Sequence, residues 1–138
     1  MGRLAVPRLG VDLCGVALRN PLILASGILG TEAELLARVA RAGAGAVTSK
    51  SCSLLPRAGH RNPTVLSWGQ GLINAVGLAN PGVEVEVDEL RRARAMLRPL
   101  GAALVGSVFA DTVENYRRVA GRLVEAGPDL LEVNISCP

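Results

Sequence analysis

Lys50, Asn134 and Cys137 are the residues of this sequence best suited to chemistry. Lysine occurs only at position 50, against fourteen arginines, and it lies at the end of the apolar run 46–51. Because arginine already supplies the surface charge, a solitary ammonium indicates a site that needs a compact charge with rotatable donors. Asn134 and Cys137 belong to the run Asn-Ile-Ser-Cys-Pro. A carboxamide offers donor and acceptor edges, and an ionised thiol can take up a proton.

The segments around these residues alternate between apolar runs and helical periodicity. Continuous apolar runs, typical of strands buried on both faces, predict strands over residues 21–26, 46–51, 103–110 and 130–135. Helices are predicted between them, and the second of these ends near Pro99. The start of that helix stays open, because residues 83–87 alternate with period two and also fit extended backbone.

Capping signals mark the first and third helices. Thr31 with Glu34 has the spacing of a capping box, and Asp111 with Glu114 repeats it. Gly43 and Gly127 are expected to end these two helices. The buried faces are predicted to consist of Leu35, Leu36, Val39 and Ala40 in the first helix, of Leu90, Ala93, Leu97 and Leu100 in the second, and of Val113, Tyr116, Ala120, Leu123 and Val124 in the third.

The alternation of strands and helices predicts an α/β fold with parallel pairing and right-handed crossovers. A doubly wound sheet usually carries GxGxxG in its first turn, whereas the turn at residues 26–30 lacks that spacing. A TIM-type (β/α)8 barrel needs about 250 residues. We therefore interpret residues 1–138 as the amino-terminal portion of a single barrel domain, with about four parallel strands and an open edge. A predicted hairpin over residues 11–18 would cover the bottom of the barrel.

Polar or small residues end each predicted strand. In a parallel barrel all these ends open on one face, where ligands bind. That face would collect Ser26, Lys50, Ser51, Ser107 and Asn134. The loop over residues 52–82 is predicted to lack regular structure, and a loop of that length in a compact domain is usually functional. The two asparagines of its segment 69–82, Asn74 and Asn80, would suit a flat heterocycle with imide and carboxylate groups.

The amino-acid composition limits which classes of ligand and which compartment fit this chain. Aromatic residues make up only 2% of the chain, which leaves few platforms for stacked nucleic-acid bases. Three cysteines without disulfide or zinc-ligand spacing indicate a reducing cytoplasm and no metal site. The sequence predicts no membrane span. Cys14 and Cys52 are expected to be packing residues, His60 a surface residue and Trp68 a packing anchor for the long loop.

Several segments together resemble the dihydroorotate dehydrogenase family, in particular its class 1 enzymes. The most specific are residues 74–82, Asn-Ala-Val-Gly-Leu-Ala-Asn-Pro-Gly, and residues 132–138, Glu-Val-Asn-Ile-Ser-Cys-Pro. Residues 20–27, 48–51 and 62–64 support the same resemblance. The third strand matches least well, since many relatives carry Asn where this chain aligns Ser107.

The resemblance implies an FMN-dependent barrel that oxidises dihydroorotate to orotate in pyrimidine biosynthesis. It assigns FMN contacts to Ser26, Lys50, Ser51, Ser107 and Asn134. It assigns substrate contacts to Lys50, Asn74, Ala75, Val76, Gly77, Leu78 and Asn134. Cys137 would be the catalytic base, removing a proton from C5 while a hydride leaves C6 for the flavin; class 2 enzymes carry Ser at that position.

The sequence leaves other interpretations of its function open. Dihydropyrimidine dehydrogenase and the tRNA dihydrouridine synthases are related flavin barrels that reduce pyrimidines, although residues 74–82 favour dihydroorotate. The chain could also be an inactive half-barrel fragment. Within class 1 the electron acceptor is open: fumarate-using enzymes work alone, whereas NAD-linked ones associate with an iron–sulfur flavoprotein subunit. Residues 80–82 favour the NAD-linked group, and a homo-oligomer is expected for the full-length protein.

Overall fold

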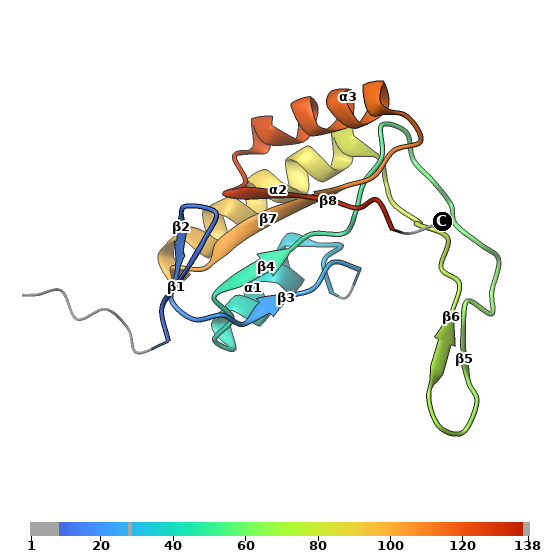
Figure 1. Cartoon of the computed structure of the whole chain (residues 1–138), viewed down its shortest axis with the longest axis horizontal. Helices are drawn as coiled ribbons and strands as arrows, with labels where there is room; N and C mark the ends of the chain where they lie inside the picture. The colour runs from blue at the N-terminus through green and yellow to red at the C-terminus, as the bar shows by residue number, and fades with distance from the viewer. Residues whose placement is uncertain (1–8, 28, 137–138) are drawn as a thin grey trace, which may run out of the picture.

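The computed structural model describes residues 9–27 and 29–136 (Figure 1). The strands are β1 (Val11–Leu13), β2 (Val16–Leu18), β3 (Ile23–Leu24), β4 (Ala46–Thr48), β5 (Val65–Ser67), β6 (Leu72–Asn74), β7 (Ala103–Val108) and β8 (Leu130–Val133). The helices are α1 (Ala33–Arg41), α2 (Val83–Leu97) and α3 (Val113–Leu123), with 3-10 turns η1 (Arg98–Leu100) and η2 (Val124–Ala126). Within the described ranges, no helix combines the length and the apolar character needed to cross a membrane.

Four strands form one parallel sheet in the order β3-β4-β7-β8. Each strand pairs with the next along the chain, and α1, α2 and α3 form the crossovers between them (Figure 1). The predicted α/β alternation and parallel pairing are therefore confirmed. The register is staggered, because Ala46 pairs with Ala103 whereas Leu130, the first residue of β8, pairs with Val105. Stagger of this kind is what closes a sheet into a barrel.

The two faces of the sheet bury different side chains. On one face Val47, Leu104 and Val108 pack against the helices, in a core that includes Leu36 and Leu90. On the other face the intervening residues pack around Leu18 of β2, namely Ala46, Ala103 and Val105. Ala46 and Ala103 are the first residues of their strands, so the β1–β2 hairpin covers the amino-terminal end of the sheet. This confirms the predicted hairpin and its position.

The first strand is shorter and less buried than predicted. Only Ile23 and Leu24 are in β3, instead of residues 21–26, and the Ile23 side chain is 41% exposed. The prediction of a strand buried on both faces is wrong here because β3 lies at the edge of the sheet, with β4 as its neighbour. The fourth strand ends at Val133, two residues earlier than expected.

The helices differ from the sequence patterns mainly at their ends. The capping box at Thr31 does not form; instead the Ala33 amide donates to a carboxylate oxygen of Glu89 on α2 at 3.0 Å. Residues 83–87 are helical, so α2 begins directly after Gly82. On α3, Thr112 rather than Asp111 caps the helix.

Burial on the helices also departs from the predicted faces. Leu36 and Ala40 are buried as expected on α1, and Leu90, Ala93 and Leu97 are buried on α2. On α3 the predicted face is partly wrong: Val113 is 87% exposed, whereas Val119, which was not predicted, is fully buried beside Leu123. Val113 is the first residue of α3, next to the Thr112 cap.

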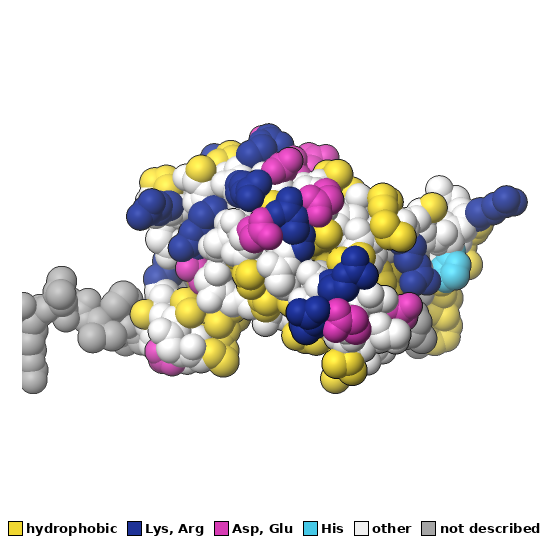
Figure 2. Space-filling model, turned by 90° about the horizontal axis from the view of Figure 1, so that it is seen from above, with side chains coloured by type: hydrophobic (Ala, Val, Ile, Leu, Met, Phe, Trp, Pro, Cys, Tyr) yellow, Lys and Arg dark blue, Asp and Glu magenta, His cyan; other side chains and the backbone are white. Residues whose placement is uncertain are grey.

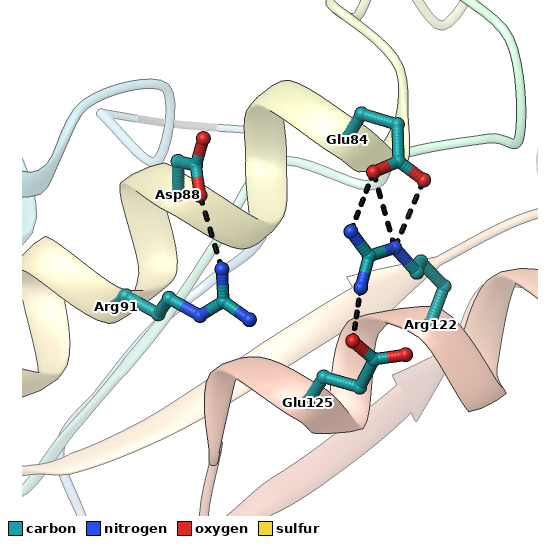
Figure 3. Close-up of polar contacts among 5 residues, drawn as sticks. All are labelled: Glu84, Asp88, Arg91, Arg122 and Glu125. Carbon is teal, nitrogen blue, oxygen red and sulfur yellow. Dashed lines mark hydrogen bonds and ion pairs between the residues drawn. The ribbon is translucent and has the colours of Figure 1, made fainter.

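Charged side chains join α2 to α3 on their solvent face. Arg122 of α3 donates to both carboxylate oxygens of Glu84 on α2, with its Nη2 2.6 Å from Oε2, and it also contacts Glu125 (Figure 3). Asp88 and Arg91 form a second pair within α2. The face seen in Figure 2 accordingly carries dark-blue and magenta side chains side by side. This mixture of both signs indicates solvated helix faces and not a basic stripe for phosphates.

The segment between β4 and α2 contains a β-hairpin, which the sequence did not predict. Strands β5 and β6 pair antiparallel and extend away from the sheet (Figure 1). We call residues 65–74 the hairpin arm. Trp68 lies at its turn, 67% exposed, so the prediction that it anchors the loop by packing is wrong. His60 is exposed, as predicted.

Candidate functional site at the carboxyl end of the sheet

An extra residue after β4 shapes the site. Thr48 pairs with Val105, and the next bridge joins Cys52 to Val108. The segment that follows β4 therefore advances by four residues between the two pairs, whereas β7 advances by three. Such bulges change the direction of a side chain locally and are common beside active sites. Here the extra residue brings the Ser51 side chain to the side of the sheet occupied by Ser107, where the two hydroxyl oxygens are 2.7 Å apart.

Four side chains from three adjacent strands form a continuous hydrogen-bond chain. Asn134 Nδ2 is 3.2 Å from Ser51 Oγ, which contacts Ser107 Oγ. Ser107 Oγ is in turn 2.8 Å from Glu132 Oε1. Ser51 and Ser107 are buried, whereas Glu132 and Asn134 are half-buried. The structure thus brings together three of the predicted site residues and adds Glu132.

Asn134 is also held through its backbone. Its amide donates to Val108 O at 2.9 Å, and its carbonyl accepts from the Tyr116 hydroxyl at 2.6 Å. Tyr116 projects from α3, where the sequence pattern identified only an apolar face. Glu132 could have been found from the sequence, because it lies two residues before Asn134 on a strand and must share its face. Tyr116 offered no comparable signal.

Lys50 and Ser26 lie at the neighbouring part of the same end of the sheet. The Lys50 amide donates to Gly30 O at 2.8 Å, and its half-buried side chain reaches towards Gly27: a methyl group at Gly27 would stand 3.9 Å from Nζ. Ser26, Glu132, Asn134 and Ser136 line an open cavity of about 360 Å³. This cavity is therefore bordered by Glu132 and Asn134, the two end members of the hydrogen-bond chain.

The segment from Asn74 to Leu78 lies elsewhere. Asn74 and Ala75 are exposed on and beside the hairpin arm, and Val76 and Gly77 are half-buried near His60. Leu78 is buried with a positive φ of 55° and lines a second cavity of about 650 Å³. The described residues show no hydrogen bond from this segment to Lys50 or Asn134.

Asn80, the other asparagine of the segment 69–82, is structural. Its Oδ1 accepts from the Gly82 amide at 2.9 Å, and its Nδ2 donates to Leu78 O at 3.0 Å and to Ser53 Oγ at 3.1 Å. The side chain is buried and its hydrogen-bonding groups are used within the protein. The expectation that both loop amides face a ligand is therefore wrong for Asn80, because it stabilises the turn that leads into α2.

The cysteines have different environments. Cys52 is fully buried, and burial, with a smaller contribution from the charge of Glu86, raises its pKa to about 12. Cys52 is a packing residue, as predicted. Cys14 is exposed in the β1–β2 turn with a φ of 52°, so its predicted packing role is wrong. Cys137 lies outside the described residues. Among those that are described, no cluster of three or more His, Cys, Asp or Glu could hold a metal ion.

Glu86 is the most unusual carboxyl group near the site. It lies on α2, is 1% exposed, and its Oε2 has no hydrogen-bond partner among the described residues. Burial raises its pKa to about 7, although a hydrogen bond from Ser49 opposes that shift. Ser49 also accepts from the Ser107 amide at 3.2 Å, so Glu86 lies behind the bulge and not in the cavity.

The parallel strands, the hairpin that covers their amino-terminal end and the crossover helices fit part of a (β/α)8 barrel. A family model described as dihydroorotate dehydrogenase matches residues 8–138, so the chain belongs to that family. Its parallel strands and crossover helices are part of the TIM-type barrel of the family, as predicted.

Curated relatives support the same assignment. Over 130 residues, 94% of this chain, it is 42% identical to the dihydroorotate dehydrogenase B (NAD(+)) catalytic subunit of Methanocaldococcus jannaschii. It is 44% identical to the protein of the same name from Methanothermobacter thermautotrophicus over the same share. The match covers 42% and 41% of those proteins respectively, so the chain spans about two fifths of their length.

Proposed function

We propose that these residues form the amino-terminal part of one FMN-binding barrel domain that oxidises dihydroorotate to orotate in pyrimidine biosynthesis. The observation that carries the proposal is the convergence of Ser51, Ser107 and Asn134 from adjacent strands at the carboxyl end of the sheet, with Lys50 beside Gly27 at the same end. Membership of the dihydroorotate dehydrogenase family supplies the reaction and the substrate.

The residues at this end fit a flavin ring. Asn134 retains one amide proton and one acceptor lone pair beyond its contacts with Ser51 and Ser136. Ser26 and Asn134 border the same cavity, and Lys50 adds a positive charge beside Gly27. In our proposal Ser26, Lys50, Ser51, Ser107 and Asn134 hold FMN. When bound, FMN would supply the acceptor for the hydride from C6 of the substrate.

The substrate would be held by Lys50, Asn134 and the segment Asn74, Ala75, Val76, Gly77 and Leu78. Lys50 would stabilise the substrate carboxylate by electrostatic attraction, and the asparagine amides would pair with its imide groups. Cys137 would act as the base that takes the proton from C5, since its thiolate can accept a proton near neutral pH. Because residues 74–78 lie apart from Lys50 here, we expect this segment to move towards Asn134 when substrate binds.

The electron acceptor in this proposal is NAD, reached through a second subunit. The two curated relatives described above are named catalytic subunits of a NAD(+)-linked enzyme, which implies a partner subunit for those proteins. We propose an iron–sulfur flavoprotein as that partner here, a homo-oligomer of the catalytic chain and a cytoplasmic location. The free thiols of Cys14 and Cys52 agree with a reducing compartment.

The test compares the 138 residues with the full-length protein. We expect the full-length protein to purify with FMN and to lose flavin absorbance when dihydroorotate is added without oxygen. The 138 residues alone should bind FMN weakly and show no turnover, because they supply only some of the strands that a barrel needs. Full-length protein that binds FMN but is not bleached by dihydroorotate would contradict the proposed reaction.

A second experiment tests whether Cys137 is the catalytic base. Replacing Cys137 with Ala should abolish dihydroorotate-dependent flavin reduction at neutral pH while flavin content is retained. Replacing it with Ser should move the pH dependence of flavin reduction to higher pH, because a hydroxyl gives up its proton less readily than a thiol. Near-normal flavin reduction by the Ala variant would exclude the role.

A further inference from the structure

We propose that Glu132 is a positioning residue that fixes the orientation of the Asn134 carboxamide through Ser107 and Ser51. This inference deepens the proposed function and rests on it for the identity of the ligand. The sequence patterns assigned no role to Glu132, although it begins the motif over residues 132–138. Its role follows from the directions in which protons can be donated along the hydrogen-bond chain.

A carboxylate can only accept hydrogen bonds. The 2.8 Å contact between Ser107 Oγ and Glu132 Oε1 therefore requires Ser107 to donate its hydroxyl proton to Glu132. Having donated its proton there, Ser107 can only accept in its 2.7 Å contact with Ser51, so Ser51 donates to Ser107. One carboxylate thus determines the direction of both hydroxyl groups.

The direction of these hydrogen bonds also determines the orientation of the Asn134 side chain. Since Ser51 donates to Ser107, its oxygen can only accept from the amide of Asn134 at 3.2 Å. The Nδ2 group must therefore face Ser51, and the amide oxygen must face the Ser136 amide, 3.4 Å away. The Tyr116 hydroxyl and Val108 O hold the backbone of Asn134, and outside the chain to Glu132 only the long 3.4 Å contact from the Ser136 amide opposes rotation of the side-chain amide by half a turn. Glu132 removes that freedom.

An oriented carboxamide matters because its two ends have opposite hydrogen-bonding character. A ligand that meets Asn134 in the cavity would find the remaining Nδ2 proton and the remaining Oδ1 lone pair at defined positions. In Glu132→Gln the new amide can either accept from Ser107 or donate to it, so both proton directions become available. Asn134 would then populate both orientations, and a ligand would pair correctly with only one.

The binding experiment is a double-mutant cycle on the full-length protein. Orotate affinity is measured from the change in flavin absorbance for the wild type, Glu132→Gln, Ser107→Ala and the double variant. We expect Glu132→Gln to weaken orotate binding up to about twofold in the otherwise unchanged protein, because a ligand pairs with only one of two populated amide orientations. In the Ser107→Ala background, where the chain is already broken, Glu132→Gln should leave orotate affinity unchanged. Equal effects in both backgrounds would overturn the proposal.

Glu125→Gln is the matched control. Glu125 is an exposed glutamate that contacts Arg122 on the helices and not the cavity. It should leave orotate affinity unchanged, and urea unfolding should give the same midpoint for Glu125→Gln and Glu132→Gln. A lower midpoint for Glu132→Gln, with loss of flavin in proportion, would assign Glu132 a structural role instead.

A ligand-free measurement separates failure of this inference from failure of the proposed function. In protein labelled with 15N at asparagine, the wild type should give one pair of Asn134 side-chain amide resonances, with one proton close to the Ser51 β protons. Glu132→Gln should give two pairs, or one exchange-broadened pair. A single unchanged pair in Glu132→Gln would overturn the proposal whether or not the protein binds orotate. Orotate binding that fails in the wild type, with the expected resonances present, would count against the proposed function alone.

Discussion

Gly45 lies directly against the backbone carbonyl of Asn20: a β carbon placed on Gly45 would stand 2.2 Å from that oxygen. The contact joins the segment before β3 to the start of β4. It is reinforced by the Gly45 amide, which donates to Leu22 O at 2.8 Å, and by Asn20 Nδ2, which donates to Gly43 O at 2.9 Å. The edge strand β3 is thus fastened to the sheet by backbone contact at its amino-terminal end.

Replacing Gly45 with Ala should destabilise the fold by about 3 kcal/mol, because the new methyl group meets backbone that cannot move aside without breaking these hydrogen bonds. Gly121→Ala is the control. Gly121 is on the exposed side of α3 with nothing within 4 Å of a β carbon, so alanine there should stabilise the helix by up to about 1 kcal/mol. Urea unfolding followed by circular dichroism measures both. Equal effects of the two substitutions would contradict the assigned contact.

Glu86 should make the stability fall as pH rises. In the fold its pKa is raised to about 7, so it keeps its proton between pH 4.5, its ordinary value, and 7, whereas the unfolded chain releases that proton. Unfolding therefore liberates a proton in this window, and the free energy of unfolding should drop across it by roughly 3 kcal/mol. Glu86→Gln should remove this slope and raise stability at pH 8.

The control for that measurement is Glu84→Gln on the same helix. A hydrogen bond from Arg122 lowers the pKa of Glu84, although slight burial opposes the shift. The stability that Glu84 contributes is lost as the pH falls through its lowered pKa, so replacing it should leave the fall between pH 4.5 and 7 in place. A Glu86→Gln protein with the slope of the wild type would show that another group carries the pH dependence.

Substitutions of Asn74 and Asn80 should have different effects, one on orotate binding and the other on the free energy of unfolding. Asn80→Ala removes a buried amide that satisfies the Gly82 amide and Leu78 O, and it should cost about 3 kcal/mol of unfolding free energy. Asn74→Ala, at an exposed position, should leave unfolding unchanged within about 0.5 kcal/mol. It should nevertheless weaken orotate binding to the full-length protein. Loss of stability in Asn74→Ala would argue against its assignment to substrate.

The ion pair between α2 and α3 should be sensitive to salt. Arg122→Met removes the contacts with Glu84 and Glu125, and the resulting fall in the midpoint of thermal unfolding should shrink as NaCl rises from about 0.05 M to about 1 M, because salt screens exposed charges. Arg117→Met, which breaks only the pair with Glu114 inside α3, should have a smaller effect at low salt. An Arg122→Met effect that is the same at both salt concentrations would identify lost packing rather than lost charge as its cause.

The sheet was predictable because each strand is an apolar run and each crossover carries a helical pattern. The ends of the elements were not, because partners distant in the sequence decide them. Glu89 caps α1 from α2 and replaces the local signal at Thr31. The alternation over residues 83–87 looked extended because Glu86, a residue normally exposed, is buried on the inner face of the helix.

The site was predictable to a similar extent. Small polar residues at strand ends pointed to Lys50, Ser107 and Asn134, but the extra residue after β4 that turns Ser51 towards Ser107 leaves no mark in the sequence. The hairpin arm was missed because its strands are three residues each and both are exposed, so their side chains show no pattern of burial. Asn80 was misjudged because an amide that caps a turn and an amide that binds a ligand look alike in the sequence.

The placement of Trp68 decides how the folding of this protein can be observed. It is the only tryptophan in the chain, and its indole is already mostly in water at the tip of the arm, far along the chain from the buried strands. Intrinsic tryptophan emission should therefore change little when the sheet unfolds. The same emission should instead change when a molecule binds to the hairpin arm and covers the indole. Tryptophan fluorescence of the unlabelled protein would therefore measure binding at the arm.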